Sequence, residues 1–178
     1  MKRKLITLII YIFIIVAGIV LGVRHFHIPD FRVIIPDELY VSGQPRGMDY
    51  MRLLYKYHIS TIVNVRSALE HREKNWHNEE LIWTKQNAVK YIELPISKQD
   101  YFPDDQIQGE FFLLMSNIEN LPLLLHGSGD DKRVAMLTAT WLKKAQGLST
   151  AETIQQIKKI IDDRPLTQQE INFITNLK

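Results

Sequence analysis

Residues 121–125 form a run of five apolar residues, and this run restricts the fold more than any other feature of the chain. A strand that is apolar along its whole length has both faces covered, which is typical of the centre of a parallel sheet with helices on either side. A loop with two glycines follows at residues 126–133, and a helical pattern of apolar residues begins at Val134. The segment therefore predicts a strand, a loop and a helix at the centre of an α/β fold.

Short β-branched runs alternate with longer amphipathic segments from residue 31 onward, which is the pattern of α/β layer folds. The predicted strands are 31–35, 39–42, 61–65, 89–94 and 121–125, and the predicted helices are 48–57, 69–86, 107–118 and 134–145. Two capping boxes, Ser149 with Glu152 and Thr167 with Glu170, predict two further helices. We therefore expect a central, mostly parallel sheet that is flanked by helices.

The amino-terminal segment is predicted to be a membrane anchor. Residues 5–23 contain no charged side chain, and as a helix these 19 residues would rise about 28 Å, close to the thickness of the hydrocarbon core of a bilayer. Basic residues at positions 2–4 precede this stretch and only Arg24 follows it directly. The positive-inside rule then places the amino terminus in the cytoplasm and the rest of the chain on the periplasmic side of a bacterial inner membrane.

A cleaved signal peptide is the alternative, although its apolar core normally has only about 7–15 residues. With an uncleaved anchor, the chain divides into three regions. These are a single-pass transmembrane signal anchor at residues 1–24, a juxtamembrane linker with the first strand at 25–35, and one domain at 36–178.

Composition and charge exclude several functions. The chain has no cysteine, which excludes disulfide scaffolds, zinc fingers and a thiol nucleophile. The net charge of +2 comes from the first 24 residues, because residues 25–178 carry 18 Lys and Arg against 20 Asp and Glu. This balance gives no support to nucleic-acid binding. We expect no nucleic-acid partner, no cofactor and no metal ion.

Two histidines at positions 71 and 77 accompany several glutamates. Their separation of six residues does not match the i, i+4 spacing of a metal-binding pair on one helix. We therefore predict that His71 and His77 lie on a solvated helix face.

The loop after the central strand has the features of an anion site. Its residues are His126, Gly127, Ser128, Gly129, Asp130, Asp131, Lys132 and Arg133. Ligands of open α/β sheets bind beyond the carboxyl ends of the strands, and the amides of a curled loop that leads into a helix bind anions. Arg133 could add two parallel hydrogen bonds to a phosphate. A plain strand-to-helix turn with solvated polar residues is the alternative interpretation.

Several segments, in their order and spacing, resemble the cysteine-dependent dual-specificity and tyrosine phosphatase superfamily, particularly its small bacterial members. They are residues 38–45 (ELYVSGQP), 62–66 (IVNVR), 91–95 and 122–133. The signature of the family is His-Cys, five residues and Arg on a strand, loop and helix, and His126 and Arg133 stand at that separation. The resemblance implies a phosphatase fold with a phosphate-binding loop at residues 126–133.

The resemblance also suggests roles for residues outside the loop. The general acid of the family lies on a loop after the strand that ends here near Leu94, where Asp100 is the matching candidate; an exposed loop acid is the alternative. Gln44 is expected near the phosphate loop. Arg66 is expected either to line the same cleft or to pair with Glu70 at i+4.

Departures from the family pattern decide the functional expectation. Gly127 stands where the family has its cysteine, so no thiolate is present to attack phosphorus. Asp130 replaces a loop glycine, and its carboxylate opposes a bound dianion. Val134 replaces the usual Thr or Ser after the arginine. Ser128 could replace the nucleophile only with a paired base.

We therefore expect a membrane-anchored phosphatase-like domain that is catalytically impaired and that binds a phosphorylated ligand or a protein partner. Two alternatives stay open. One is an active phosphomonoester hydrolase of the dual-specificity type that uses an unorthodox nucleophile. The other is an envelope scaffold that uses only the fold.

Overall fold

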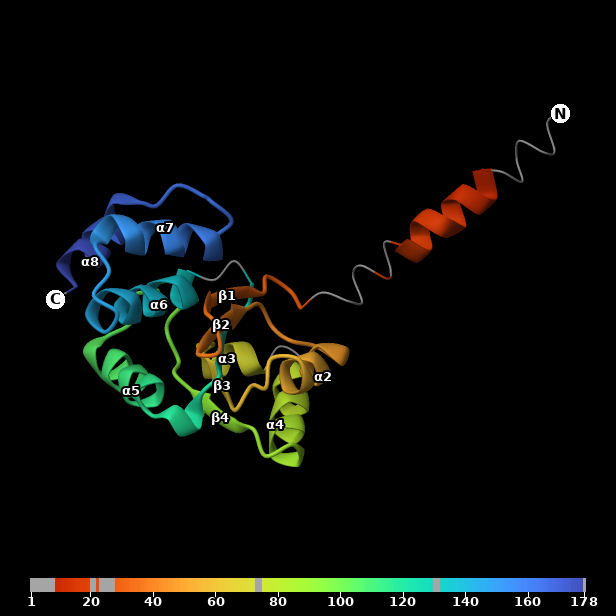
Figure 1. The fold of residues 1–178 in the computed structure, drawn as a ribbon, viewed down its shortest axis with the longest axis horizontal. Helices are drawn as coiled ribbons and strands as arrows, with labels where there is room; N and C mark the ends of the chain where they lie inside the picture. The colour runs from red at the N-terminus through yellow and green to blue at the C-terminus, as the bar shows by residue number, and fades with distance from the viewer. Residues whose placement is uncertain (1–8, 20–21, 23–27, 73–74, 130–131, 178) are drawn as a thin grey trace.

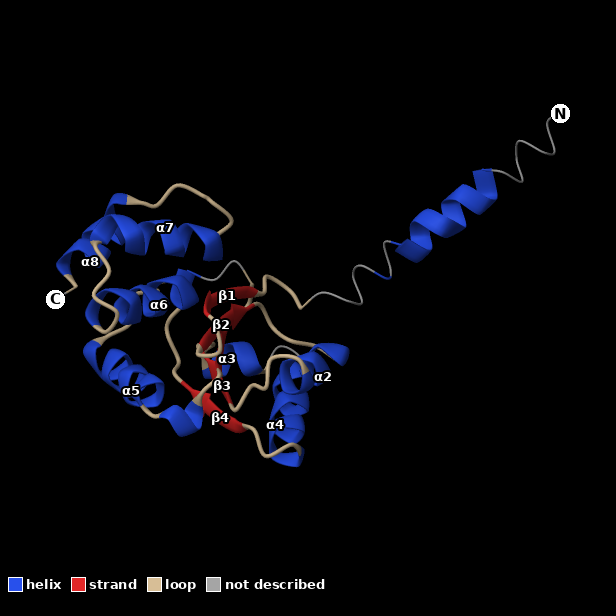
Figure 2. Cartoon of the chain, in the orientation of Figure 1, coloured by secondary structure: helices blue, strands red, loops and turns tan. Residues whose placement is uncertain are grey.

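The computed structural model of the chain describes residues 9–19, 22, 28–72, 75–129 and 132–177. Its main body is a central sheet with helices on both sides (Figures 1 and 2). The strands are β1 (Arg32–Ile35), β2 (Leu39–Ser42), β3 (Thr61–Asn64), β4 (Lys90–Glu93) and β5 (Leu123–His126). The predicted α/β class is confirmed, and each predicted strand is present with small changes at its ends.

The five strands lie in the order β1-β2-β5-β3-β4. β5 pairs in parallel with β2 and β3, and β3 pairs in parallel with β4, whereas β1 is an antiparallel edge strand beside β2. All four residues of β5 are buried, as expected of the central strand. The mostly parallel sheet predicted from the apolar run is therefore confirmed.

Helices cover both faces of the sheet. They are α2 (Met48–Tyr55), α3 (Ala68–His71), α4 (Trp76–Gln86), α5 (Asp105–Ser116), α6 (Lys132–Lys144), α7 (Thr150–Ile160) and α8 (Gln168–Asn176), with a 3₁₀ turn, η1, at Ile118–Asn120. Both predicted capping boxes are present: Ser149 and Thr167 each accept a hydrogen bond from the backbone of the glutamate three residues on. α7 and α8 therefore begin where the sequence predicts.

The prediction of a single helix at residues 69–86 is wrong, because the structure has two helices there, α3 and α4. α3 starts with a capping box of its own, formed by Ser67 and Glu70, and ends at His71. Asn75, a residue type that favours helix starts over helix interiors, is the N-cap residue of α4. Residues of both helices meet Glu93 of β4: His71 of α3 and His77 of α4.

The core lies on both faces of the sheet because neighbouring strand residues point in opposite directions. Val63 belongs to the larger cluster under α5, α6, α7 and α8, and Ile62 belongs to the smaller cluster under α2 and α4. Likewise, Leu125 of β5 belongs to the larger cluster and its neighbour Leu124 belongs to the smaller one. Full burial of such a side chain stabilises the fold by about 1.5–3 kcal/mol, so the two clusters fix the position of β5 from both sides.

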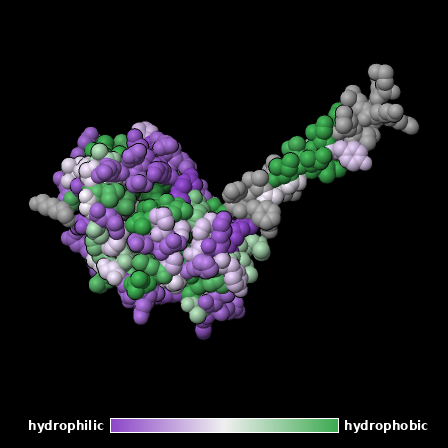
Figure 3. Space-filling view, in the orientation of Figure 1, coloured by the Kyte–Doolittle hydropathy of each residue, from purple (hydrophilic) through white to green (hydrophobic). Residues whose placement is uncertain are grey.

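Residues 9–19 form a helix whose apolar side chains are exposed, as Figure 3 shows in green. Residues 5–8, 20, 21 and 23 of the predicted anchor lie outside the described residues. Among the residues that the structure describes, no helix has the length and apolar character that crossing a membrane requires.

Candidate functional site

The candidate site lies where the parallel strands end. Ser42, His126, Asn64 and Glu93 are in register as the last residues of β2, β5, β3 and β4. The loop after β5 and the start of α6 therefore lie at the carboxyl edge of the sheet, as the sequence predicts. Asp130 and Asp131 of this loop lie outside the described residues.

The two glycines of the loop have different surroundings. Gly127 is buried, and its amide donates a hydrogen bond to the Ser42 carbonyl of β2 at 3.4 Å. Gly129 has φ of 100°, and a Cβ atom there would lie 2.8 Å from Asp30 Oδ2. Because both the backbone angle and the contact exclude a side chain, Gly129 allows the close approach of the loop to Asp30.

The guanidinium of Arg133 is buried at the base of the site, with the residue only 1% exposed. It binds Glu70 through two parallel hydrogen bonds, Nη1 to Oε2 at 2.7 Å and Nη2 to Oε1 at 3.2 Å. It also donates to the Ile96 carbonyl at 3.3 Å and to Ser128 Oγ at 3.4 Å. These contacts fix the orientation of the guanidinium.

Glu70 is held in turn by the capping box of α3. It accepts hydrogen bonds from the backbone amide and the hydroxyl of Ser67, at 3.0 and 3.2 Å. Arg66 Nε lies 3.4 Å from Glu70 Oε1, so the predicted i+4 pair is present. Burial by itself raises the pKa of Glu70, but hydrogen bonds from Arg133 and Ser67 outweigh it and lower the pKa to about 2. Glu70 is therefore a carboxylate that links two arginines.

A second buried network lies beneath the loop. His126 is fully buried, and its Nε2 lies 3.3 Å from Oε1 of the equally buried Glu80. The same oxygen accepts hydrogen bonds from Gln44 Nε2 and the Tyr50 hydroxyl, both at 3.2 Å. Burial and the neighbouring Glu80 raise the pKa of Tyr50, so this phenol stays protonated. His126 therefore supports the loop from below and is not among the residues that line the hollow above it.

A hollow of about 560 Å³ opens above Arg133. It is lined by Lys98, Gln99, Tyr101, Ser128, Gly129, Lys132 and Arg133. Three of these residues are cationic, and no carboxylate is among the described residues that line it. Lys132 Nζ lies 4.8 Å from the centre of the Tyr101 ring, which joins the two walls of the hollow. The charge and size suit an anion larger than a single phosphate.

Asp100, the candidate general acid, lies on the loop that forms one wall of the hollow. Its neighbours Gln99 and Tyr101 line the hollow, but Asp100 itself is exposed and does not. Its backbone amide bonds to Ser97 Oγ at 3.2 Å. The structure thus brings Ser128, Gly129, Lys132 and Arg133 together at the hollow, with Asp100 beside it and Gly127 beneath it.

Comparisons with known proteins bear on the fold. No protein-family model matches the chain, and no curated protein does. Solved structures do match: the core catalytic domain of the PP-IP phosphatase SIW14 from S. cerevisiae superimposes with a TM-score of 0.70 at 17% identity, over 84% of this chain and 86% of that one. The fold is that of the cysteine-based phosphatases.

Two further structures agree with this assignment. PTPMT1, solved in complex with PI(5)P, has a TM-score of 0.62 at 16% identity and covers 83% of this chain and 93% of its own. A candidate phosphatase from Neisseria meningitidis has a TM-score of 0.63 at 18% identity over 83% of this chain and 100% of its own. The phosphatase resemblance inferred from the sequence is therefore confirmed at the level of the fold.

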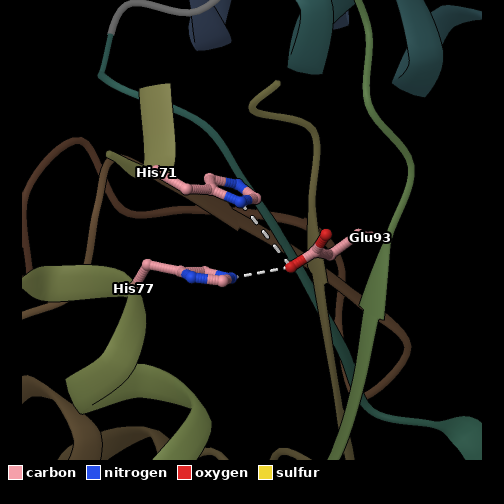
Figure 4. Close-up of side chains that lie close together, drawn as sticks. All are labelled: His71, His77 and Glu93. Atoms are coloured by element: carbon pink, nitrogen blue, oxygen red, sulfur yellow. Dashed lines mark hydrogen bonds and ion pairs between the residues drawn. The ribbon is translucent and has the colours of Figure 1, made fainter. Parts of the chain in front are cut away.

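The prediction for His71 and His77 is wrong, because these residues of the phosphatase-like domain do not lie on one solvated helix face. The His71 side chain is only 9% exposed and that of His77 18%. Their rings stack with centres 3.9 Å apart, and both face Glu93 of β4 (Figure 4). Burial and the neighbouring His77 lower the pKa of His71. The six-residue spacing is misleading because the two histidines lie on different helices.

Proposed function

We propose that the domain binds phosphorylated ligands in the hollow and does not cleave phosphate esters. The observation that carries this proposal is the combination of Gly127 at the nucleophile position with a cationic hollow beside it. A glycine cannot form the covalent phosphoryl intermediate that a thiolate forms. Three cationic side chains nevertheless line the hollow: Lys98, Lys132 and Arg133.

The two lysines supply most of the attraction for an anion in this proposal. Arg133 is paired with Glu70, so part of its charge is neutralised inside the protein. Lys98, on the loop after β4, and Lys132, the first residue of α6, line the same hollow. The hydroxyl of Ser128 adds a hydrogen-bond donor at the base.

The surroundings of Ser128 support binding rather than catalysis. A serine becomes a nucleophile when an adjacent base removes its proton. His126, two residues earlier in the chain, is a candidate base, but its ring lies in the buried network against Glu80. Ser128 is exposed, and its Oγ lies by the guanidinium of Arg133. Asp100 does not line the hollow and is poorly placed to protonate a leaving group.

We infer that the ligand carries more than one phosphate, as inositol phosphates and phosphoinositide headgroups do. Three cations around a hollow of about 560 Å³ exceed the need of one phosphate monoester. The names of two similar structures agree with this class, since one is a PP-IP phosphatase and the other was solved with PI(5)P.

We also propose that residues 5–23 anchor the domain to a membrane, on the strength of their uncharged sequence.

A binding experiment tests this function. Inositol hexakisphosphate and inorganic phosphate are titrated calorimetrically into the full chain in detergent, beside Lys98→Gln and Lys132→Gln. We expect the inositol phosphate to bind more tightly than phosphate and each substitution to weaken it roughly 3- to 10-fold. Lys85→Gln, at an exposed position in the last turn of α4, is the matched control and should bind normally.

An aryl-phosphate assay on the same preparations separates binding from catalysis. We expect no turnover by the wild-type chain. Turnover that disappears in Ser128→Ala would show an active hydrolase and overturn the proposal. Equal ligand affinity in the wild type, Lys98→Gln and Lys132→Gln would place the ligand elsewhere.

A chain that stays in the membrane fraction after alkaline extraction supports the anchor, and its release contradicts it.

A further inference from the structure

Two histidines and a glutamate meet at the carboxyl end of β4, outside the hollow. His71 is the last residue of α3, His77 lies in the first turn of α4, and Glu93 is the last residue of β4. We propose that these three side chains bind a divalent transition-metal ion and that Zn²⁺ is the ion that suits them best.

The geometry brings one ligand atom of each side chain close together. His77 Nε2 lies 2.7 Å from Glu93 Oε1, and His71 Nδ1 lies 3.8 Å from the same oxygen. Ligand atoms of the three residues all lie within 4.8 Å of one another. Atoms that share a tetrahedral zinc ion are about 3.4 Å apart, given bonds of about 2.0–2.2 Å. Small side-chain rotations therefore suffice to close the site.

Figure 4 shows the two imidazole rings lying one above the other, each with a nitrogen toward the Glu93 carboxylate. Their planes are within 15° of parallel. An imidazole binds a metal ion close to the plane of its ring, so the two rings would tilt out of this parallel arrangement to share one ion.

The donor set selects the class of ion. Two imidazole nitrogens and one carboxylate suit zinc and similar transition metals, whereas calcium and magnesium prefer oxygen ligands throughout. Three protein ligands leave a fourth position for water. The Glu93 side chain is 40% exposed, so this position can be reached from solvent.

The aromatic surroundings give the site an optical reporter. The Trp76 ring meets His71 and His77 edge to face, with centres 5.4 and 5.6 Å apart. The guanidinium carbon of Arg66 lies 4.0 Å from the centre of the same indole ring. The positive charge of Arg66 is paired with Glu70, which reduces its repulsion of a bound cation. A metal ion should therefore change the fluorescence of Trp76.

Zinc titration of the full chain in detergent, without a polyhistidine tag and without phosphate ligand, tests the proposal. We expect one zinc ion per chain, a change in tryptophan fluorescence and a rise in the midpoint of thermal unfolding. His77→Gln and Glu93→Gln should each weaken zinc binding at least about tenfold. Because the readout is metal binding, the result does not depend on whether the hollow binds phosphate.

Two controls address the remaining histidines except His126, whose side chain is fully buried. His58→Asn removes an exposed histidine at a left-handed backbone position that asparagine tolerates, and it should bind zinc normally. His25→Gln with His27→Gln removes the pair in the linker and should do the same. Absence of zinc binding by the wild type overturns the proposal, as does equal binding by the wild type, His77→Gln and Glu93→Gln.

A gain-of-signal variant decides the matter if the loss variants fail to fold. His77→Cys places a thiolate ligand in a chain that has no other cysteine. With Co²⁺ as the probe, a thiolate-to-cobalt charge-transfer band in this variant supports a metal site at position 77. A folded His77→Cys chain that takes up Co²⁺ without this band contradicts it.

Discussion

Arg133 and Glu70 are 63 residues apart in the chain, yet they face each other through two parallel hydrogen bonds of 2.7 and 3.2 Å. The arginine lies in the first turn of α6, the helix that follows the central strand, and the glutamate closes the capping box of α3. The pair therefore ties the base of the hollow to α3, the helix that follows β3.

Glu70→Gln should lower the free energy of unfolding by about 2–4 kcal/mol, because it leaves the buried guanidinium of Arg133 without its counter-charge. The same change should strengthen binding of inositol hexakisphosphate, since the positive charge at the base is no longer neutralised. Chemical denaturation and calorimetry measure the two effects. Glu110→Gln, at an exposed position on α5, is the control; equal stability of both variants would contradict the role given to Glu70.

Gly127→Cys should create phosphatase activity that the wild type lacks. The thiol would stand at the end of β5, beside Arg133 and below the cationic hollow, where a thiolate is stabilised. Hydrolysis of an aryl phosphate should rise by roughly 100-fold or more over the wild-type background, and further with Asp130→Gly. Gly127→Ser is the matched control and should remain inactive. A folded Gly127→Cys, Asp130→Gly chain without activity would mean that the hollow does not position a phosphate ester.

Gly129→Ala should lower the free energy of unfolding by about 1–3 kcal/mol. Alanine is strained at φ of 100°, and its Cβ would lie 2.8 Å from Asp30 Oδ2. Thermal unfolding should show that Asp30→Ala relieves part of this loss. Gly109→Ala in α5 should instead raise the free energy of unfolding by about 0.5–1 kcal/mol. No atom lies within 4 Å of the Cβ that alanine would add there, and alanine favours a helix over glycine. Equal effects of the two alanines would disprove this argument.

The free energy of unfolding should decrease at low pH, because protonation of Glu170 breaks its ion pair with Arg164. Burial raises the pKa of Glu170, but hydrogen bonds from Arg164 and Thr167 outweigh it and hold the pKa at about 2. A carboxyl whose pKa is depressed by folding contributes stability above its unfolded pKa, near 4.5, and loses it as the pH falls toward 2. Glu170→Gln should therefore be less stable than the wild type at pH 7 and nearly equal to it at pH 2. A constant difference in unfolding free energy between pH 7 and pH 2 would refute this.

Some features of the fold follow from local sequence alone. The apolar run predicts β5 because it contains no polar side chain that would have to stay in contact with water. The Ser149 and Thr167 capping boxes predict helix starts because the glutamate of each box is only three residues away. Asp104 is the N-cap residue of α5 and accepts a hydrogen bond from the Ile107 amide three residues on. Each of these signals is complete within a few residues.

The site could be predicted only in part, because its decisive contacts are distant in sequence. Glu70 and Glu80 have the sequence pattern of surface acids on helices, yet one binds Arg133 and the other lies against His126. The pairing of His71 with His77 depends on the break between α3 and α4, which the helical pattern at residues 69–86 hides. The residues that the loop contributes to the hollow were predicted, whereas Lys98 and Tyr101 came from the structure.

α6 is buried over ten consecutive residues, from Arg133 to Leu142, with α7 and α8 packed against it. A helix confined on every side cannot shift when a ligand arrives, so the floor of the hollow is preorganised. The rim is different, because Lys98 and Gln99 are exposed on a loop. We therefore expect the floor to keep its shape when a ligand binds and the rim, which carries Lys98, to adapt to the ligand, so that relatives with the same floor could differ in ligand choice through this loop alone.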